Sequence, residues 1–283
     1  MTVLVAAAVL AAAVTHAGWN ALAHGIKDQL VAFTLIAGGA AVMGAVMACF
    51  APVPAAGAWP YLVASALLHV GYQALLMRSF SLGDFGQMYP IARGTAPLVV
   101  TVAAVVFVGE HLGAWQAAGV GVASAGLVGV ALWGIKGSGT RPHWPAIAAA
   151  LATGLSIAAY TVVDGLGVRA SGTPVGYIAW LMVLEGLLVP AYAVYARRGA
   201  LTAQLRPHVG RGLLGAAMSI AAYGLVLWAQ TRAPLAPIAA LRESSIIVGA
   251  AIGALLFKER FGAPRIAAAC LMVLGIGLML KAG

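Results

Sequence analysis

The stretch that decides the fold is QMYPIARGTAP, residues 87–97. It opens an apolar run that continues to Val108 and ends at Gly109-Glu110-His111. An arginine, Arg93, stands inside this run together with a tyrosine and two prolines. Such residues are costly in hydrocarbon, so they are expected to face protein or a water-filled cavity. The stretch therefore predicts a membrane helix with one functional face.

The composition indicates an integral membrane protein. Of 283 residues, 63% are hydrophobic and 8% are charged, and the mean hydropathy is +0.99, whereas a soluble domain carries about a quarter charged residues. Two cysteines, Cys49 and Cys270, fall in apolar runs and are expected to be small core residues. They form no disulfide or metal pattern, so neither a metal site nor a cofactor is expected.

The net charge of +9 does not indicate a nucleic-acid partner. No basic stretch is interleaved with aromatic residues, which nucleic-acid binding would favour. In a membrane protein, Lys and Arg instead mark the cytoplasmic loops. The partners expected are the lipid bilayer and a small-molecule substrate.

Apolar runs of about 20 residues, the length that crosses a bilayer, divide the chain into predicted spans. There are ten: 2–24, 30–51, 60–80, 86–108, 112–134, 144–164, 175–196, 209–231, 235–257 and 262–281. The longest polar connector, 136–143, separates five spans from five. We expect an all-α polytopic membrane protein with one five-helix repeat in 1–135 and a second in 144–283.

Basic residues in the loops predict the orientation. Loops after odd-numbered spans and their flanks hold 11: Lys27, Arg78, Lys136, Arg141, Arg197, Arg198, Arg206, Arg211, Lys258, Arg260 and Arg265. Loops after even-numbered spans and the C-terminus hold 3: Arg169, Arg232 and Lys281. The positive-inside rule then places both termini on the non-cytoplasmic side.

The polar residues recur at a fixed offset. Arg93 and Arg242 are 149 residues apart, and so are Glu110 and Glu259. Because each half has an odd number of spans, the second half enters the membrane from the opposite side. Such inverted repeats are typical of transporters, in which the halves rock around a site near the bilayer midplane.

The doubled signature resembles EamA-type carriers of the drug/metabolite transporter superfamily. The first copy is Gly109-Glu110-His111-Leu112-Gly113, and the second is Lys258-Glu259-Arg260-Phe261-Gly262. The run 16–20, His-Ala-Gly-Trp-Asn, is similar to the first-helix motif of the family, and Pro90 and Pro97 fall where its fourth helix has prolines. The sixth span departs from the pattern, with Tyr160 and Asp164 in place of a Trp-Asn pair.

The resemblance implies ten helices around a central cavity lined by helices 3, 4, 8 and 9. Tyr72, Tyr89 and His69 make the chain look closest to bacterial aromatic amino acid exporters. This implies a multi-pass protein of the bacterial inner membrane, working as a monomer or weak dimer.

Candidate substrate-binding residues lie on the third, fourth, eighth and ninth spans. His69, Tyr72 and Gln73 share one helix face by their spacing, and either line the cavity or form a cluster between helices. Tyr89 and Tyr223 are expected to be lining aromatics. Two hydroxyls complete the set, and they either bind substrate or fold back onto their own helix: Ser244 and Ser245.

The charged residues within the spans are considered separately, because they are candidates for structural or gating roles as well as for substrate binding. Arg93 and Arg242 either bind a substrate carboxylate or act as structural or gating charges, with Glu243 as an adjacent acid. Glu185 is either a functional residue or the partner of an arginine. Asp164 is expected at a helix end, in water. On the first span, the shared face of His16, Trp19 and Asn20 is expected to pack between helices.

Two transport functions follow from these residues. One is export of aromatic or bulky neutral amino acids and related metabolites by alternating access. The other is transport of an anionic or sugar-linked metabolite bound by the intramembrane arginines. An enzyme is not expected, because no nucleophile with a spaced histidine, metal-ligand pattern or pair of aspartates is present. An assembly or sensor subunit would leave the repeat unexplained.

Overall fold

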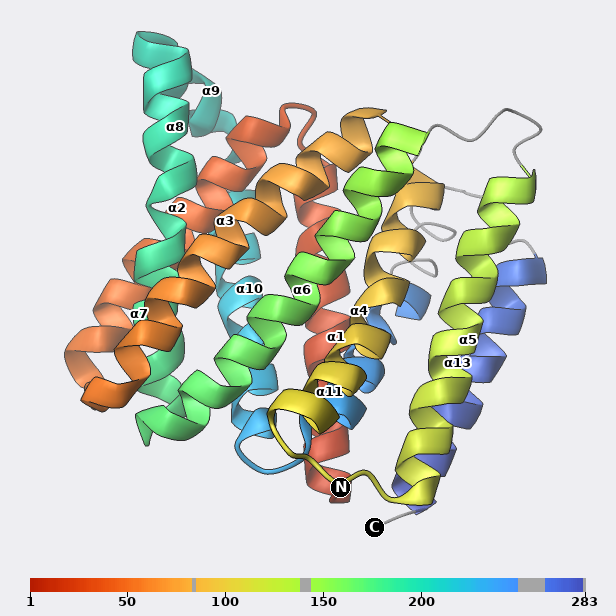
Figure 1. Ribbon diagram of the computed structural model, residues 1–283. Helices are drawn as coiled ribbons and strands as arrows, with labels where there is room; N and C mark the ends of the chain where they lie inside the picture. Colours follow the sequence, from red (N-terminus) through yellow and green to blue (C-terminus); the bar gives the residue numbers. More distant parts are fainter. Residues whose placement is uncertain (83–84, 138–143, 249–262, 282–283) are drawn as a thin grey trace. The chain divides into compact units, whose positions relative to one another are not determined.

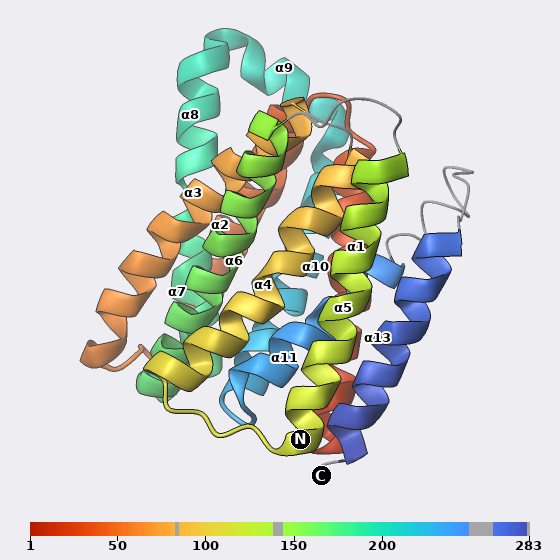
Figure 2. The same ribbon diagram turned by 45° about the vertical axis from the view of Figure 1, so that its right-hand side comes forward.

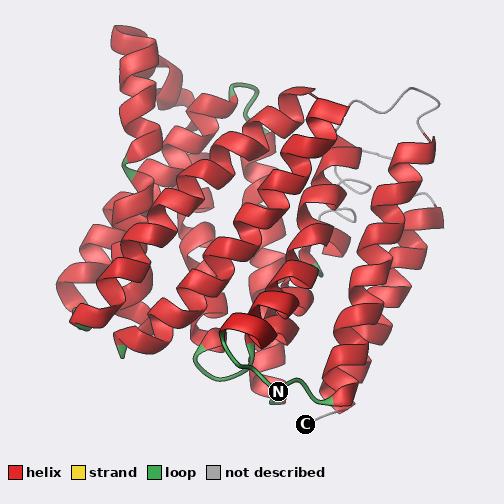
Figure 3. Ribbon diagram, in the orientation of Figure 1, coloured by secondary structure: helices red, strands yellow, loops and turns green. Residues whose placement is uncertain are grey.

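The computed structural model describes the chain except residues 83–84, 138–143, 249–262 and 282–283. All regular structure in the described residues is helical (Figure 3). The long helices are α1 (Val3–His24), α2 (Gln29–Phe50), α3 (Trp59–Leu82), α4 (Phe85–Phe107), α5 (Ala114–Gly137), α6 (Trp144–Ser171), α7 (Pro174–Gly186), α8 (Leu188–Arg197), α10 (Val209–Gln230), α11 (Leu235–Arg242) and α13 (Ala263–Lys281). Short helical turns are η1 (Ala56–Ala58), η2 (Arg198–Ala200), α9 (Leu201–Leu205) and η3 (Arg206–His208).

Side chains that satisfy free backbone amides start two of these helices. Asp28 caps α2 by accepting hydrogen bonds from the amides of Leu30 and Val31. Thr173 caps α7 by accepting one from the amide of Gly176, and Pro174 occupies the first turn, where no donor is lost. Between α6 and α7 the chain turns at Gly172, whose φ of +70° favours glycine. Local sequence therefore determines these two starts.

The prediction of an all-helical, multi-pass membrane protein is confirmed. In the part of the chain that the structure describes, four helical stretches are long and apolar enough to cross a membrane: Val3–Ala23, Gln29–Phe50, Trp144–Ser171 and Pro174–Gln230. The last contains α7 to α10. Shorter apolar helices cover 91–107 and 266–281. The ten-helix inverted repeat stays a prediction.

Three predicted spans differ from the observed helices. The span 144–164 is part of a longer helix, α6, which continues to Ser171. The span 175–196 is divided into α7 and α8 at Leu187. The span 235–257 is interrupted after α11, where Glu243 and Ser244 form a turn before helical residues resume at Ser245. Both interruptions lie beside buried charged side chains.

The chain forms two compact units, each built from separate segments. Unit 1 comprises Met1–Leu10, Gly71–Val162 and Arg232–Gly283. In it α5 packs along α13 and α4, and α11 packs against α4 and α5. The pairing of α5 with α13 is visible in both Figure 1 and Figure 2. Its closest approach brings Gly119 against the backbone of Gly275.

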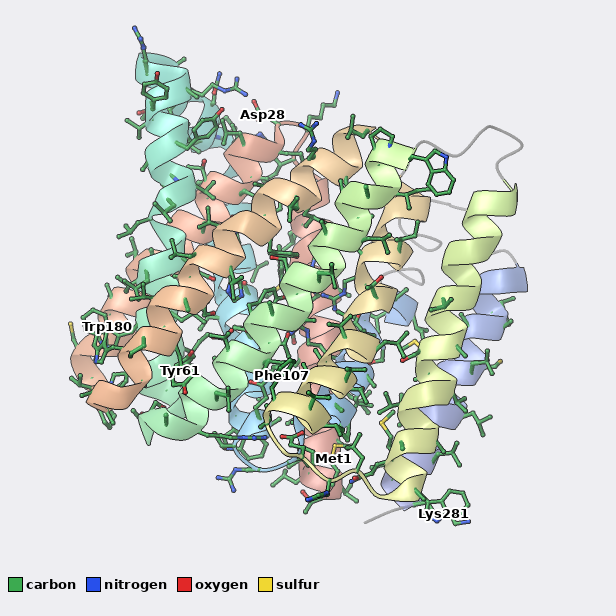
Figure 4. All side chains as sticks on the ribbon, viewed as in Figure 1. Met1, Asp28, Tyr61, Phe107, Trp180 and Lys281 are labelled. Carbon is green, nitrogen blue, oxygen red and sulfur yellow. The ribbon has the colours of Figure 1, made fainter. Side chains whose placement is uncertain are left out.

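Unit 2 comprises Ala11–Val70 and Val163–Thr231. In it α2 packs against α7, α8 and α10, around a core that includes Leu62, Leu181 and Leu227. At one end, the capping residue Asp28 also accepts a hydrogen bond of 2.7 Å from Arg197. Figure 4 places Asp28 at the end of this unit where α9 lies, and Trp180 at the other end.

The expectation that both cysteines are core residues was wrong. Cys49 on α2 and Cys270 on α13 are both exposed. An apolar run facing lipid has the same composition as one facing protein, so composition alone did not separate the two.

Candidate functional site

One candidate site lies in unit 1 at the interruption after α11. We call it the arginine cluster: Arg93, Tyr160, Arg242, Glu243, Ser244 and Ser245. The turn is held by short-range hydrogen bonds, from the amide of Glu243 to the carbonyl of Ala240 at 3.2 Å and from the amide of Ser244 to that of Leu241 at 3.1 Å. The turn thus presents consecutive polar side chains inside an otherwise apolar segment.

Arg93 of α4 forms an ion pair with the turn. Its Nε lies 2.8 Å from Oε2 of Glu243, and the two side chains are 2% and 3% exposed. Its Nη2 donates a hydrogen bond of 3.2 Å to the hydroxyl of Ser245. Arg93 therefore joins α4 to the residues on the far side of the interruption.

Arg242, the last residue of α11, contacts a tyrosine. Its Nη2 donates a hydrogen bond of 2.9 Å to the hydroxyl of Tyr160 on α6, and its guanidinium carbon lies 5.8 Å from the centre of that ring. The ring of Tyr72 on α3 packs edge-on against Tyr160, with 5.5 Å between centroids. A buried guanidinium is thus placed beside one aromatic ring, which in turn packs against a second ring.

The cluster is rich in hydrogen-bond donors. Among the described acidic residues of unit 1, Glu243 is the one within the cluster, and Glu110 instead accepts a hydrogen bond from the amide of Leu235. Two guanidinium groups therefore share a cluster with one carboxylate. The hydroxyl of Ser244 is buried and makes no hydrogen bond within the described residues. Guanidinium and hydroxyl donors together suit a carboxylate ligand.

A second candidate site lies in unit 2. We call it the carboxylate cluster: His69, Asp164, Tyr177, Glu185 and Tyr223. Asp164 of α6 is fully buried. Its Oδ1 accepts a hydrogen bond of 2.8 Å from the hydroxyl of Tyr177, and its Oδ2 accepts one from that of Tyr223. Two phenol donors thus replace water around a buried acid, as a buried charge requires.

His69 of α3 links this acid to a second one. Its Nδ1 lies 3.4 Å from Oε2 of Glu185 on α7 and 3.0 Å from the carbonyl oxygen of Ser65. Its ring packs edge-on against that of Tyr223, with 5.5 Å between centroids. The result is a continuous group of five titratable side chains from α3, α6, α7 and α10.

The structure distributes the predicted substrate-binding residues between these clusters. Ser244 and Ser245 belong to the arginine cluster, and Tyr72 lies against it. His69 and Tyr223 belong to the carboxylate cluster. Gln73 is half-buried, and its side-chain oxygen makes no hydrogen bond within the described residues. Tyr89 is part of α4, but its side chain lies outside the described residues.

Two expectations about acids require correction. Asp164 was expected at a helix end in water, but it lies seven residues inside α6 and is fully buried. The suggested arginine partner of Glu185 is a histidine, His69. For Arg93, pairing with an acid was one of the alternatives, and the structure pairs it with Glu243. Glu259, in the second copy of the loop signature, lies outside the described residues.

Sequence reasoning missed the roles of Tyr160 and Tyr177. Tyr160 and Asp164 are four residues, about one helical turn, apart, so they lie on the same face of α6. If the helix is taken to continue past Asp164, this spacing indicates that Tyr160 belongs to a polar face. Tyr177 lies early in α7 with no charged neighbour in the sequence, so only the tertiary structure identifies it.

The first-helix motif forms local contacts. Trp19 donates a hydrogen bond of 3.2 Å from its indole to Nδ1 of His16, and Asn20 donates one of 2.8 Å to the carbonyl of His16. Across the described ranges no group of three or more His, Cys, Asp or Glu side chains is arranged to hold a metal ion.

Long apolar helices that enclose buried charged clusters define a polytopic membrane protein. Residues 144–281 match the family model described as EamA-like transporter family. A solved structure titled "Crystal structure of protein" is similar with a TM-score of 0.74 and 18% identity, covering 98% of this chain and 99% of that one. At that identity the likeness concerns the fold alone. No match was found among the curated proteins.

Residues 144–281 therefore resemble EamA-like transporters, a family of membrane transporters rather than enzymes. A transporter of this kind acts on a small molecule within the bilayer.

Proposed function

We propose that the protein exports aromatic or bulky neutral amino acids and related metabolites, and that the arginine cluster binds the substrate carboxylate. The observation that carries this proposal is the set of donors at the interruption after α11. Arg242 is the last residue of α11 and Ser244 lies two residues further, in the turn, and the Ser244 hydroxyl has no hydrogen bond within the described residues.

Arg93 and Arg242 have different parts in this proposal. Arg93 holds the turn, because its Nε is paired with the Glu243 carboxylate at 2.8 Å. Arg242 donates a hydrogen bond to the hydroxyl of Tyr160 at 2.9 Å, and its charge also acts on Glu243. A phenol oxygen is a weaker partner for a guanidinium than a carboxylate is. An incoming carboxylate is therefore expected to take the place of the phenol as hydrogen-bond acceptor.

The apolar part of the substrate is assigned to the aromatic rings beside Arg242. Tyr72 and Tyr160 pack edge-on at 5.5 Å, an arrangement that presents ring faces to a third aromatic group. Such rings favour an aromatic or bulky apolar body over a sugar, which needs many more hydrogen-bond partners.

The second candidate is a carrier of anionic metabolites, and the same two arginines favour it. An amino acid and its deaminated analogue separate the candidates. Phenylalanine carries both charges, 3-phenylpropionate keeps only the carboxylate, and 2-phenylethylamine keeps only the ammonium group.

The test is uptake of radiolabelled phenylalanine into proteoliposomes, with each analogue as competitor. An amino acid carrier should show saturable uptake that unlabelled phenylalanine inhibits more strongly than either analogue. Equal or stronger inhibition by 3-phenylpropionate favours the anion carrier. Absence of flux for every aromatic amino acid contradicts the first proposal.

The export direction, the bacterial inner membrane and the non-cytoplasmic termini belong to the same proposal. The excess of basic residues in one set of loops supports the orientation of the termini. The export direction and the bacterial inner membrane follow from the resemblance to bacterial aromatic amino acid exporters. A monomer is proposed as the working unit, since both clusters are complete within one chain.

A further inference from the structure

We propose that His69 and Glu185 form a proton-binding site in unit 2, and that release and rebinding of this proton accompany the transport cycle. His69 is buried and Glu185 is partly buried: the side chains are 9% and 13% exposed, and Nδ1 of His69 lies 3.4 Å from Oε2 of Glu185. The proposal assigns a function to the carboxylate cluster, which takes no part in the proposed substrate binding in unit 1.

Three groups lie close to Nδ1 of His69. The carbonyl oxygen of Ser65 is 3.0 Å away, the Ser65 hydroxyl 3.2 Å and Oε2 of Glu185 3.4 Å. The carbonyl and the carboxylate accept a hydrogen from Nδ1, whereas the hydroxyl can donate one to it, so the tautomer of the ring decides which contact is a hydrogen bond. In either tautomer the imidazole can take up one further proton and become a cation beside the Glu185 carboxylate.

A carboxylate paired with histidine differs from one paired with arginine. Arginine keeps its charge at every relevant pH, so an acid beside it stays ionised. Histidine and glutamate can exchange a proton, and the loaded pair is neutral overall whichever group holds that proton, because either both groups are charged with opposite sign or neither is charged. Loss of the proton leaves a buried negative charge, which is costly unless water or a cation reaches it.

The titratable groups around the pair come from each element in the cluster. Asp164 on α6 faces it with a carboxylate, whereas Tyr177 on α7 and Tyr223 on α10 face it with phenols. Because both phenols donate to Asp164, that carboxylate is stabilised as an anion. Its negative charge favours retention of a proton by the neighbouring pair.

The pair adjoins a discontinuity in its own helix. Glu185 lies in the last turn of α7, which ends at Gly186, and α8 begins at Leu188. Gly186 packs so closely on α2 that an added Cβ would lie 2.5 Å from the carbonyl oxygen of Ala37. A change of charge at Glu185 therefore acts on a tightly packed helix end, where small shifts alter the contact with α2.

The first test needs no substrate. Infrared spectra of the purified full-length protein are recorded against pH, and the C=O stretch of protonated carboxyl groups is followed. We expect Glu185→Gln to lose a titrating component that the control Glu110→Gln retains. In His69→Gln the same component should titrate at a different pH, because Glu185 has lost its partner. Spectra of Glu185→Gln identical to those of the unmodified protein would overturn the proposal, as would an unchanged midpoint in His69→Gln.

The second test measures coupling and rests on the proposed function, because it uses phenylalanine as the transported probe. With the membrane potential clamped, a gradient of one pH unit should drive ~10-fold accumulation if one proton exchanges for one substrate. In Glu185→Gln the gradient should no longer drive accumulation, while exchange of internal for external phenylalanine continues. Accumulation by the variant equal to that of the unmodified protein would contradict coupling through this pair.

The two tests fail separately. A titrating Glu185 band with no phenylalanine flux would refute the proposal that phenylalanine is a substrate, and would leave the proposed proton-binding site supported. Phenylalanine flux that ignores the pH gradient, without a Glu185 band, would refute the proton site and leave the proposed function intact.

Discussion

Neutralising Glu243 should strongly destabilise the protein. Glu243→Gln removes the carboxylate from an ion pair whose Nε–Oε2 distance is 2.8 Å and whose side chains are 2% and 3% exposed. Removing one partner of a buried pair costs about 3–5 kcal/mol, because the remaining charge stays buried without compensation. At about 2–4 °C for each kcal/mol, the thermal midpoint should fall by about 6–20 °C.

The same structure predicts that the two single substitutions do not add. Arg93→Gln leaves the Glu243 carboxylate buried, whereas the double variant leaves no charge in the pair. The double variant should therefore be more stable than the sum of the single effects predicts, by about 2 kcal/mol. Thermal unfolding in detergent, followed by the fluorescence of the 7 tryptophans, gives all four midpoints.

Additive midpoints would refute this reasoning, because they would mean that the two side chains do not interact. A suitable control is Glu110→Gln, since that carboxylate accepts a hydrogen bond from a backbone amide and is only part-buried. Its effect should be distinctly smaller than that of Glu243→Gln.

Three further outcomes follow from the structure. Gly119→Ala should lower the thermal midpoint, with an overpacking cost of about 1–3 kcal/mol, because the added Cβ would lie 2.6 Å from a backbone oxygen of α13. In the control Gly121→Ala the added Cβ meets nothing within 4 Å, so the midpoint should be unchanged. Tyr177→Phe should lower the free energy of unfolding by about 1.5–3 kcal/mol, because it removes a hydrogen-bond donor to the Asp164 carboxylate. The control Tyr195→Phe, at a side chain that is 77% exposed, should leave the free energy of unfolding unchanged in the same assay. A reporter fused to the C-terminus should be active only outside the cytoplasm, and activity on the cytoplasmic side would reverse the predicted orientation.

Much of the helical framework was predictable because the length of an apolar run is a local property. The spans proposed for α1 to α4 end within a residue or two of the observed helices. The sequence also allowed an acid as the partner of Arg93, since an arginine in a membrane helix needs a negative or polar neighbour. Glu243, next to the repeated Arg242, was among the available acids.

One of the two helix interruptions has a local signal. Gly186 ends α7, and Pro190 has no amide hydrogen to donate to the carbonyl of Gly186 four residues earlier. The turn at Glu243 and Ser244 contains neither proline nor glycine, and there a tertiary contact with Arg93 holds the Glu243 side chain. Asp164 was misplaced for a related reason. A hydropathy window ends a span at the first charge, but here two phenols from other helices replace water around that charge and α6 continues to Ser171.

The central claim is that Arg242 binds the carboxylate of a transported amino acid. The most direct test is the initial rate of radiolabelled phenylalanine uptake into proteoliposomes by the unmodified protein, by Arg242→Gln and by the matched control Arg211→Gln, whose arginine is exposed. Loss of a charged hydrogen bond to substrate, worth about 1.5–3 kcal/mol, should lower uptake at low substrate concentration by about 10- to 150-fold. The control should transport normally. Uptake by Arg242→Gln equal to that of the unmodified protein would contradict the account.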